Sequence, residues 1–148
     1  MTDQEIRKAI WDSVEKGKKV FVYATVDTQN HPHARYMGAL MIKEGVIYMV
    51  TSSESRKMQQ IKANPRSEMV FADPEYKEVA TIDGESRIDE SLELKKEFWQ
   101  ANPICKDYFS GYDTPEFGLI AFEPRSAEYL NLALQHEPFV VSLREVDE

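Results

Sequence analysis

Cysteine is almost absent from this chain of 148 residues, since Cys105 is the only one. A disulfide within the chain is therefore excluded, which fits the reducing conditions of the cytosol. Long apolar runs are also missing, because polar residues interrupt every apolar stretch well before the ~20 residues that a membrane-spanning helix needs. The segment Met1–Glu5 has neither the basic start nor the apolar core of a secretory signal. We therefore expect a cytosolic protein.

Basic residues are scarce relative to acidic ones. The chain has 18 Lys and Arg against 26 Asp and Glu, for a net charge of −8. Nucleic acids and anionic membranes require counter-charge over a wide surface, so this balance argues against both as partners. It leaves room for one small anion in a local basic pocket. The chain also lacks internal repeats, a Gly-rich P-loop and the Ser-His-Asp order of a hydrolase triad.

The patterning predicts a single domain over residues 1–148, with an N-terminal helix within 1–17 and a C-terminal tail over 133–148. Thr2 and Glu5 form a capping-box pattern, and Gly17 ends the helix. Apolar residues at 139–141 and 143 suggest that the tail docks on the domain. Runs rich in β-branched and aromatic residues predict strands at 18–28, 34–43, 46–52, 67–73 and 77–90, and a strand pair or one strand broken at Pro124 over 117–132. Shorter helices are expected at 56–64 and 91–102, with a helical turn at 103–110.

The expected strands are joined mainly by short turns, which favours an antiparallel meander over a doubly wound sheet. Asn30 suits a left-handed turn position, Glu44-Gly45 reads as a tight turn, and Gly84 suggests a bend. The predicted fold is mainly β, a small antiparallel barrel with flanking helices.

The stretch from Met49 to Pro65, MVTSSESRKMQQIKANP, places hydroxyls and two cations where a helix begins. A helix N-terminus presents free N–H groups and partial positive charge, so Thr51, Ser52, Ser55, Arg56 and Lys57 suit a phosphate. The alternative is ordinary capping by Ser53 or Ser55, with solvated cations.

A second segment, Arg35-Tyr36-Met37-Gly38, lies on the strand expected to pair with the one that delivers Thr51. Glycine within a strand often marks the close approach of a ligand, although a bulge explains it equally well. A phosphate at one end and an accessible strand beside it would suit a phosphorylated aromatic cofactor.

Two long segments carry a family resemblance. The segment VYATVDTQNHPHARYMGALMIKEGVIYMVTSSESRKMQQIKANPRSEMVF resembles the flavin-binding split barrels of the pyridoxamine 5′-phosphate oxidase-like superfamily, in particular their general stress protein branch. The later FSGYDTPEFGLIAFEPRSAEYLNL resembles the closing strands of that branch. The likeness covers most of residues 20–132, and it rests on the order of the motifs.

The resemblance implies a homodimer of six-stranded antiparallel split barrels of the FMN-binding type, with FMN at the interface. The cofactor-binding positions that it implies combine the phosphate cluster, the flavin-ring strand and two aromatic residues of the closing wall: Arg35, Tyr36, Met37, Gly38, Val50, Thr51, Ser52, Ser55, Arg56, Lys57, Phe109 and Tyr112.

The expected function is that of an FMN-dependent oxidoreductase acting on a small substrate, with no identified catalytic residue. Three alternatives stay open: a flavin-binding stress or sensor module without turnover, the same barrel holding haem or a deazaflavin, and a dimeric structural domain with an empty groove. The substrate-binding segment of true pyridoxamine phosphate oxidases is not evident, so the resemblance does not carry vitamin B6 oxidation to this chain.

Two further residue groups have a simpler interpretation. His31 and His33 share the spacing of some metal sites, but no carboxylate adjoins them in the sequence, and we expect no metal. Cys105 lacks a neighbouring base, so a buried, inert thiol is expected.

Overall fold

The structure is a computed structural model that describes residues 1–144. Its helices are α1 (Asp3–Gly17), α2 (Arg56–Ala63), α3 (Leu92–Ala101) and the 3-10 helix η1 (Pro103–Asp107). Its strands are β1 (Phe21–Val26), β2 (Pro32–Met37), β3 (Met41–Lys43), β4 (Val46–Ser52), β5 (Arg66–Ala72), β6 (Glu78–Asp89), β7 (Phe117–Asn131) and β8 (Phe139–Ser142).

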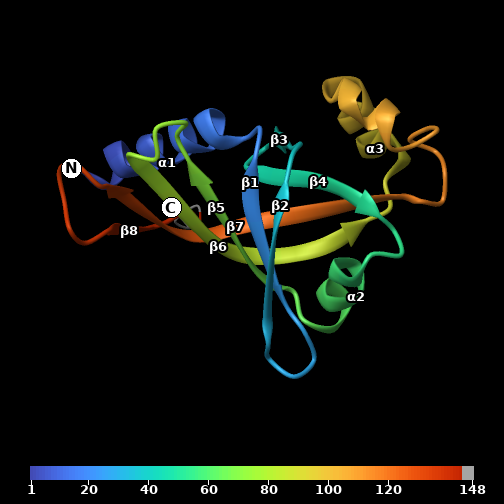
Figure 1. The fold of residues 1–148 in the computed structure, drawn as a ribbon, viewed down its shortest axis with the longest axis horizontal. Coiled ribbons are helices and arrows are strands. Elements are labelled where there is room, and N and C mark those ends of the chain that lie inside the picture. The colour runs from blue at the N-terminus through green and yellow to red at the C-terminus, as the bar shows by residue number, and fades with distance from the viewer. Residues whose placement is uncertain (145–148) are drawn as a thin grey trace.

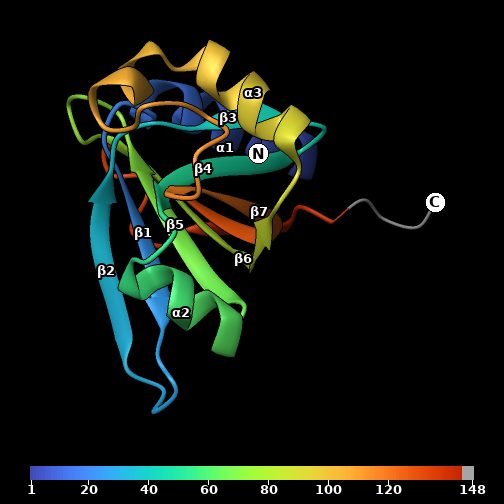
Figure 2. The same ribbon diagram turned by 90° about the vertical axis from the view of Figure 1, so that its right-hand side faces the viewer.

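The strands form one antiparallel sheet in the order β2-β1-β5-β6-β7-β4-β3, and β8 pairs with β7. The sheet curves strongly but does not close, because β2 and β3 are its two ends and do not pair with each other. α1 and α3 lie along one side of the curved sheet and α2 lies on the opposite side (Figures 1 and 2). The predicted mainly β fold is confirmed, and it is a split barrel with flanking helices.

Several local predictions are confirmed. Thr2 and Glu5 make the reciprocal hydrogen bonds of a capping box at the start of α1. Asn30 has a φ of 65°, as expected for the β1–β2 turn, and Glu44 and Gly45 also have positive φ in the β3–β4 turn. Such two-residue turns match the twist of antiparallel strands, which explains why this hairpin is so short.

The strand count differs from the six strands that the resemblance implies. The predicted strand at 34–43 is interrupted after Met37, so that it forms β2 and β3 at opposite ends of the sheet. The predicted tail contributes β8, in which Val141 is buried against the core. β7 runs through Pro124 without a break.

β6 and β7 form the longest ladder of the sheet, and it is irregular at one point. The register shifts between Asp83 and Gly84, where a Cβ on Gly84 would lie 2.3 Å from the Glu123 carbonyl oxygen. Glycine is therefore required for the two strands to approach at this bulge.

Two apolar clusters fill the interior. One lies inside the barrel under α1 and includes Ile10, Tyr23, Met69 and Phe122. The other joins α3 and η1 to the end of β7 through Phe98 and Phe117. Within the described range, no helix has the length and hydropathy needed to cross a bilayer.

Candidate functional site

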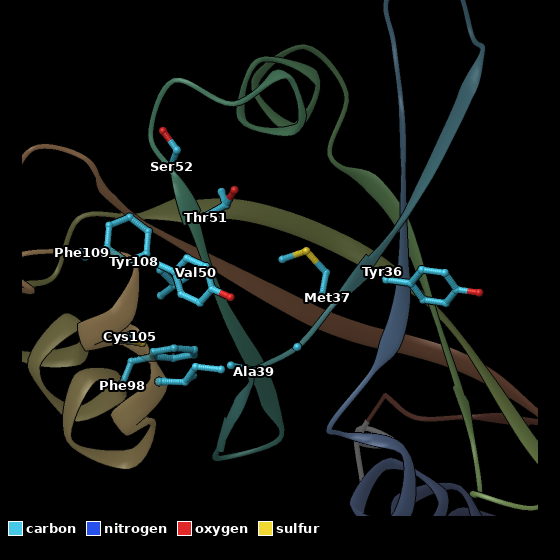
Figure 3. A pocket seen from close by; sticks show the side chains of 12 residues that line it. Tyr36, Met37, Ala39, Val50, Thr51, Ser52, Phe98, Cys105, Tyr108 and Phe109 are labelled. Carbon is cyan, nitrogen blue, oxygen red and sulfur yellow. The ribbon is translucent and has the colours of Figure 1, made fainter.

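A pocket of about 460 Å³ lies where the sheet is split, between the ends of β2 and β4 (Figure 3). Segment 36–39 supplies one side, segment 50–52 another, and α3 with the turns after it the third. The lining residues are Tyr36, Met37, Gly38, Ala39, Val50, Thr51, Ser52, Phe98, Ile104, Cys105, Tyr108 and Phe109. None of these side chains carries a charge at neutral pH, so the pocket suits the flat, largely apolar part of a ligand.

Two free strand edges border the pocket. Among residues 1–144, β2 pairs only with β1, and β3 pairs with β4 only through Val46, Ile47 and Tyr48. The segment 49–52 therefore has a ladder partner on one side only, namely β7. Free strand edges present N–H and C=O groups that can bind the polar rim of a planar ring.

Gly38 lies where β2 ends and the chain crosses toward β3. A Cβ built there would meet only the Lys19 carbonyl oxygen, at 3.6 Å, which is an ordinary contact. The packing of the protein itself therefore does not require glycine at this position. The missing side chain instead leaves space at the pocket wall, which favours close approach by a ligand.

An aromatic cluster forms the third wall. Phe117 packs against Phe98, Trp99 and Phe109 with ring centroids 5.0–6.4 Å apart. This packing fixes Phe109 at the pocket. Tyr112 packs on Trp99 at 6.4 Å and does not line the pocket.

Hydrogen bonds to β1 and α2 fix the side chain of Arg35. Its Nη1 donates to the Tyr23 carbonyl oxygen at 3.1 Å and to Thr25 Oγ1 at 2.9 Å, and its Nη2 donates to Gln60 Oε1 at 3.4 Å. The guanidinium carbon also lies 5.9 Å from the centroid of the Tyr23 ring. Every acceptor is uncharged, so these contacts orient the guanidinium without neutralising it.

Lys57 connects the cations to the pocket. Its Nζ donates to Thr51 Oγ1 at 2.9 Å, and Thr51 lines the pocket. Ser55 occupies the N-cap position of α2, but its side chain makes no capping hydrogen bond. The N–H group of Met58 donates to the Ser55 carbonyl oxygen, and within the described residues those of Arg56 and Lys57 keep the capacity to bind an anion.

A close approach between strands places the loop that leads into α2. Ser53 N donates to the Glu116 carbonyl oxygen at 2.9 Å. A Cβ on Gly118 would lie 2.8 Å from the Met58 side chain and 3.0 Å from the Thr51 carbonyl oxygen. Gly118 therefore allows β7 to support both the end of β4 and the first turn of α2.

The positive charge of this cluster is not compensated. Within residues 1–144, no carboxylate lies within 4.0 Å of the charged nitrogens of Arg35, Arg56 or Lys57. Burial lowers the pKa of Lys57, and the charge of Arg35 lowers it further. Burial also lowers the pKa of Arg35, with a smaller contribution from Arg56. Arg35 and Lys57 are partly buried and Arg56 is exposed, and a group of cations without a carboxylate partner in this range favours the binding of an anion.

The structure brings together most of the residues predicted from the sequence. Seven of them line the pocket, namely Tyr36, Met37, Gly38, Val50, Thr51, Ser52 and Phe109. The ring of Tyr36 turns away from the pocket, and the residue is 77% exposed, so its main chain rather than its ring borders the pocket (Figure 3). Arg35, Ser55, Arg56 and Lys57 lie outside the lining, in the cation cluster.

Sequence reasoning did not identify the remaining lining residues, which are Ala39, Phe98, Ile104, Cys105 and Tyr108. Four of them come from the chain after β6, and only the tertiary packing of Phe98 and Phe117 brings that segment to the pocket. Cys105 is buried, as expected, and burial raises the pKa of its thiol. Gln60 and Thr25 were also missed, because neither belongs to a recognisable motif.

The two histidines of the β1–β2 turn meet a carboxylate from the start of the same turn, Asp27. His33 Nε2 lies 2.8 Å from Asp27 Oδ2, and His31 Nδ1 lies 3.8 Å from it. Asp27 Oδ1 also accepts from the backbone N–H groups of Gln29 and His31. In the part of the chain that the structure describes, no three His, Cys, Asp or Glu side chains are grouped as metal ligands. Asp27 therefore serves to fasten the turn.

Comparison with known proteins gives consistent matches. The sequence model of the family described as "Pyridoxamine 5′-phosphate oxidase like" matches residues 5–144. General stress protein 26 of Bacillus subtilis is 32% identical over 139 residues, with 88% of this chain and 92% of that protein covered.

Two solved structures share the fold at lower sequence identity. One is a pyridoxamine 5′-phosphate oxidase-related, FMN binding protein of Nostoc punctiforme, with a TM-score of 0.69, 18% identity, and coverage of 90% of this chain and 87% of that one. The other is a heme binding protein of Mycobacterium smegmatis, with a TM-score of 0.74, 16% identity, and coverage of 96% and 58%.

Proposed function

Because the chain belongs to the pyridoxamine 5′-phosphate oxidase-like family, we propose that it binds FMN in the split of the barrel. One observation carries the proposal: three cations that have no carboxylate partner among residues 1–144 adjoin an uncharged pocket between two free strand edges. An anionic group and a flat ring in one ligand would satisfy both features.

The phosphate would be held by Arg35, Arg56 and Lys57. The hydroxyls of Thr51, Ser52 and Ser55 and the first N–H groups of α2 would add hydrogen bonds. Hydrogen bonds between charged groups and phosphate are short and about twice as strong as neutral ones. The geometry supports this role for Lys57 most directly, because its Nζ already reaches a hydroxyl of the pocket wall.

The ring would lie between the ends of β2 and β4, where Gly38 leaves space and Phe109 packs from the third side. Backbone groups of Tyr36–Gly38 and Val50–Ser52 would bind its polar rim. A bound FMN supplies the transfer of hydride or single electrons. No His, Asp, Glu, Lys or Arg lines the described pocket, so the protein's part would be to bind, orient and exclude water.

The partner in this proposal is a second copy of the chain. Tyr36 and Tyr108 are 77% and 75% exposed beside the pocket. The outward face of β1 and β5 carries the half-buried Val22, Ala24 and Val70 beside the exposed Arg66 and Glu68. A mixture of apolar residues with polar ones at the edge is typical of subunit interfaces. We therefore propose a cytosolic homodimer in which the second subunit closes the site, and size-exclusion chromatography with light scattering tests its mass.

The deciding experiment compares FMN, riboflavin and haem as ligands of the purified protein. We expect stoichiometric quenching of FMN fluorescence and much weaker binding of riboflavin, which shares the ring but lacks the phosphate. Binding of neither flavin would refute the proposal. A strong Soret band on adding haem, without flavin binding, would instead favour haem, which the shared fold of the Mycobacterium smegmatis protein makes the second candidate.

The oxidoreductase activity is a separate proposal and needs a separate test. NADH or NADPH would be supplied with a quinone or a nitroaromatic acceptor, and consumption of the nicotinamide would be followed with and without bound FMN. Turnover that requires FMN supports an enzyme. Stoichiometric flavin binding without turnover for any pair supports the storage or sensor function.

A further inference from the structure

We propose that Gln60 is a positioning residue, which fixes Arg35 with an uncharged acceptor and so keeps the charge of Arg35 available for a phosphate monoester. This inference rests on the proposed function. It starts from a ring of three hydrogen bonds that joins β1, β2 and α2. Arg35 Nη1 donates to Thr25 Oγ1 at 2.9 Å, Thr25 Oγ1 donates to Gln60 Oε1 at 2.6 Å, and Arg35 Nη2 donates to the same Oε1 at 3.4 Å.

The directions of these bonds follow from Arg35, because a guanidinium only donates. Arg35 Nη2 donates to the side-chain atom of Gln60, so that atom must be the amide oxygen. An amide oxygen only accepts, so the Thr25 hydroxyl, which accepts from Arg35, donates its own hydrogen to Gln60. The side-chain amide of Gln60 is therefore oriented by its neighbours, and one of them is the hydroxyl of the buried Thr25.

The chemistry of the acceptor matters more than its presence. A carboxylate at the same position would accept both hydrogen bonds equally well. It would also place a negative charge against Arg35 and satisfy the guanidinium before any ligand arrives. The amide orients Arg35 and leaves its positive charge uncompensated. The other contacts of Arg35, to the Tyr23 carbonyl and ring, are also uncharged.

The position of α2 makes this contact specific. α2 begins with Arg56 and Lys57, and Gln60 lies one turn later, so the same helix that supplies two of the cations orients the third. Gln59, its neighbour, is exposed and has no side-chain hydrogen bond within the described residues. Gln59→Glu therefore adds the same charge to the same helix without touching Arg35, and it is the matched control for Gln60→Glu.

Binding of FMN and of riboflavin by the full-length parent, Gln60→Glu and Gln59→Glu tests the proposal. We expect Gln60→Glu to raise the Kd for FMN at least tenfold more than Gln59→Glu does. The Kd for riboflavin should stay within twofold of the parent in both variants, because the change acts on the phosphate. If Gln60 only satisfied the buried Thr25 hydroxyl, a carboxylate would replace it and FMN binding would not change.

A second readout needs no ligand. A glutamate paired with Arg35 has a folded-state pKa below its unfolded value of about 4.3, so it stabilises the fold above that pH and loses the effect as pH falls. Gln60→Glu should therefore melt at a higher temperature than the parent at pH 7 and lose that difference by pH 3.5. Gln59→Glu should show no such gain.

The outcomes separate the two proposals. A parent that binds neither flavin overturns the proposed function and, with it, the role of Gln60. A parent that binds FMN together with a Gln60→Glu variant of equal affinity overturns the role of Gln60 alone, as does a Gln60→Glu variant whose melting temperature shows no pH-dependent gain. If Gln60→Glu does not fold, Gln60→Met takes its place. It removes the acceptor without adding charge and should still weaken FMN binding while leaving riboflavin binding unchanged.

Discussion

Substitution of Lys57 is the most direct test of the proposed phosphate site. We expect Lys57→Met to weaken FMN binding and to leave the stability of the fold intact. Methionine keeps the length and the apolar stem of lysine and removes only the ammonium group. The contact that is lost would be a hydrogen bond between a charged donor and a charged acceptor. Such bonds contribute about 1.5–3 kcal/mol, which corresponds to a rise in Kd of roughly 10- to 150-fold.

The same substitution should leave the stability of the ligand-free protein intact or raise it. Lys57 has no carboxylate partner in the described chain, and it lies near the charge of Arg35. Removing it leaves no unpaired charge behind, so we expect the free energy of unfolding to fall by no more than about 0.5 kcal/mol. Thr51 Oγ1 loses one donor but keeps its contact with Ser55 Oγ at 3.4 Å.

The pH dependence of that difference has a definite sign. Folding lowers the pKa of Lys57. A lysine of this kind opposes folding while it is charged, and the opposition disappears as pH rises through the folded pKa toward the unfolded value of about 10.4. Any advantage in stability of Lys57→Met over the parent should therefore be present at neutral pH and vanish above pH 10.

Flavin fluorescence titration at pH 7 measures both affinities, with riboflavin as the ligand that lacks the phosphate. Lys62→Met is the control, because Lys62 lies in the last turn of the same helix, is exposed, and changes the net charge equally. An unchanged FMN affinity in Lys57→Met would show that the phosphate site is misplaced. Equal weakening of FMN and riboflavin would assign the effect to the pocket rather than to the phosphate.

Three further substitutions test the geometry. Gly38→Val should fold as well as the parent, since a Cβ there meets only an ordinary contact, but its methyl groups should lower FMN affinity at least tenfold in the same titration; undiminished binding would contradict a ligand at this wall. Gly84→Ala should lose on the order of 3 kcal/mol in urea unfolding, because its Cβ would overlap the Glu123 carbonyl, and a loss below about 1 kcal/mol would contradict the close packing at the bulge. Asp27→Asn should be less stable than the parent at pH 7, because hydrogen bonds from His33 first, and then from backbone N–H groups of the turn, lower the pKa of Asp27 to about 2. Since this stability is present above the unfolded pKa and lost as pH falls toward 2, the gap in thermal stability should close between pH 4 and pH 2, and a gap independent of pH would refute the role of the carboxylate.

Predictions from the sequence succeeded where the decisive interactions are local. The capping box of α1 and the left-handed turn at Asn30 each involve residues within a few positions of one another. The strands were recognisable because β-branched and aromatic residues crowd into short runs. Distant contacts decided the remaining features. The interruption after Met37 and the pairing of β8 depend on where β4 and β7 lie, which the local pattern does not contain.

In the candidate site, too, the residues on continuous stretches were predicted and those placed by distant contacts were not. Thr51 to Lys57 and Arg35 to Gly38 were identified because they lie on continuous stretches with suitable chemistry. The wall from Phe98 to Phe109 could be found only in part, because its place depends on packing against Phe117, which the local pattern does not contain. Tyr112 illustrates the difficulty. Like Phe109 it is an aromatic residue of the segment after η1, but it packs on Trp99 and does not line the pocket.

The sequence could not reveal that the cations near the pocket lack a carboxylate partner among the described residues. Acidic residues outnumber basic ones by 26 to 18, so most partly buried cations would be expected to find a carboxylate. Lys43 and Arg125 do, with Glu97 and Glu85. Arg35 instead meets a carbonyl, a hydroxyl and an amide, although a single-atom change at Gln60 would supply a carboxylate. A folded chain gains no stability from leaving that charge uncompensated, so a ligand explains the arrangement better than the fold does.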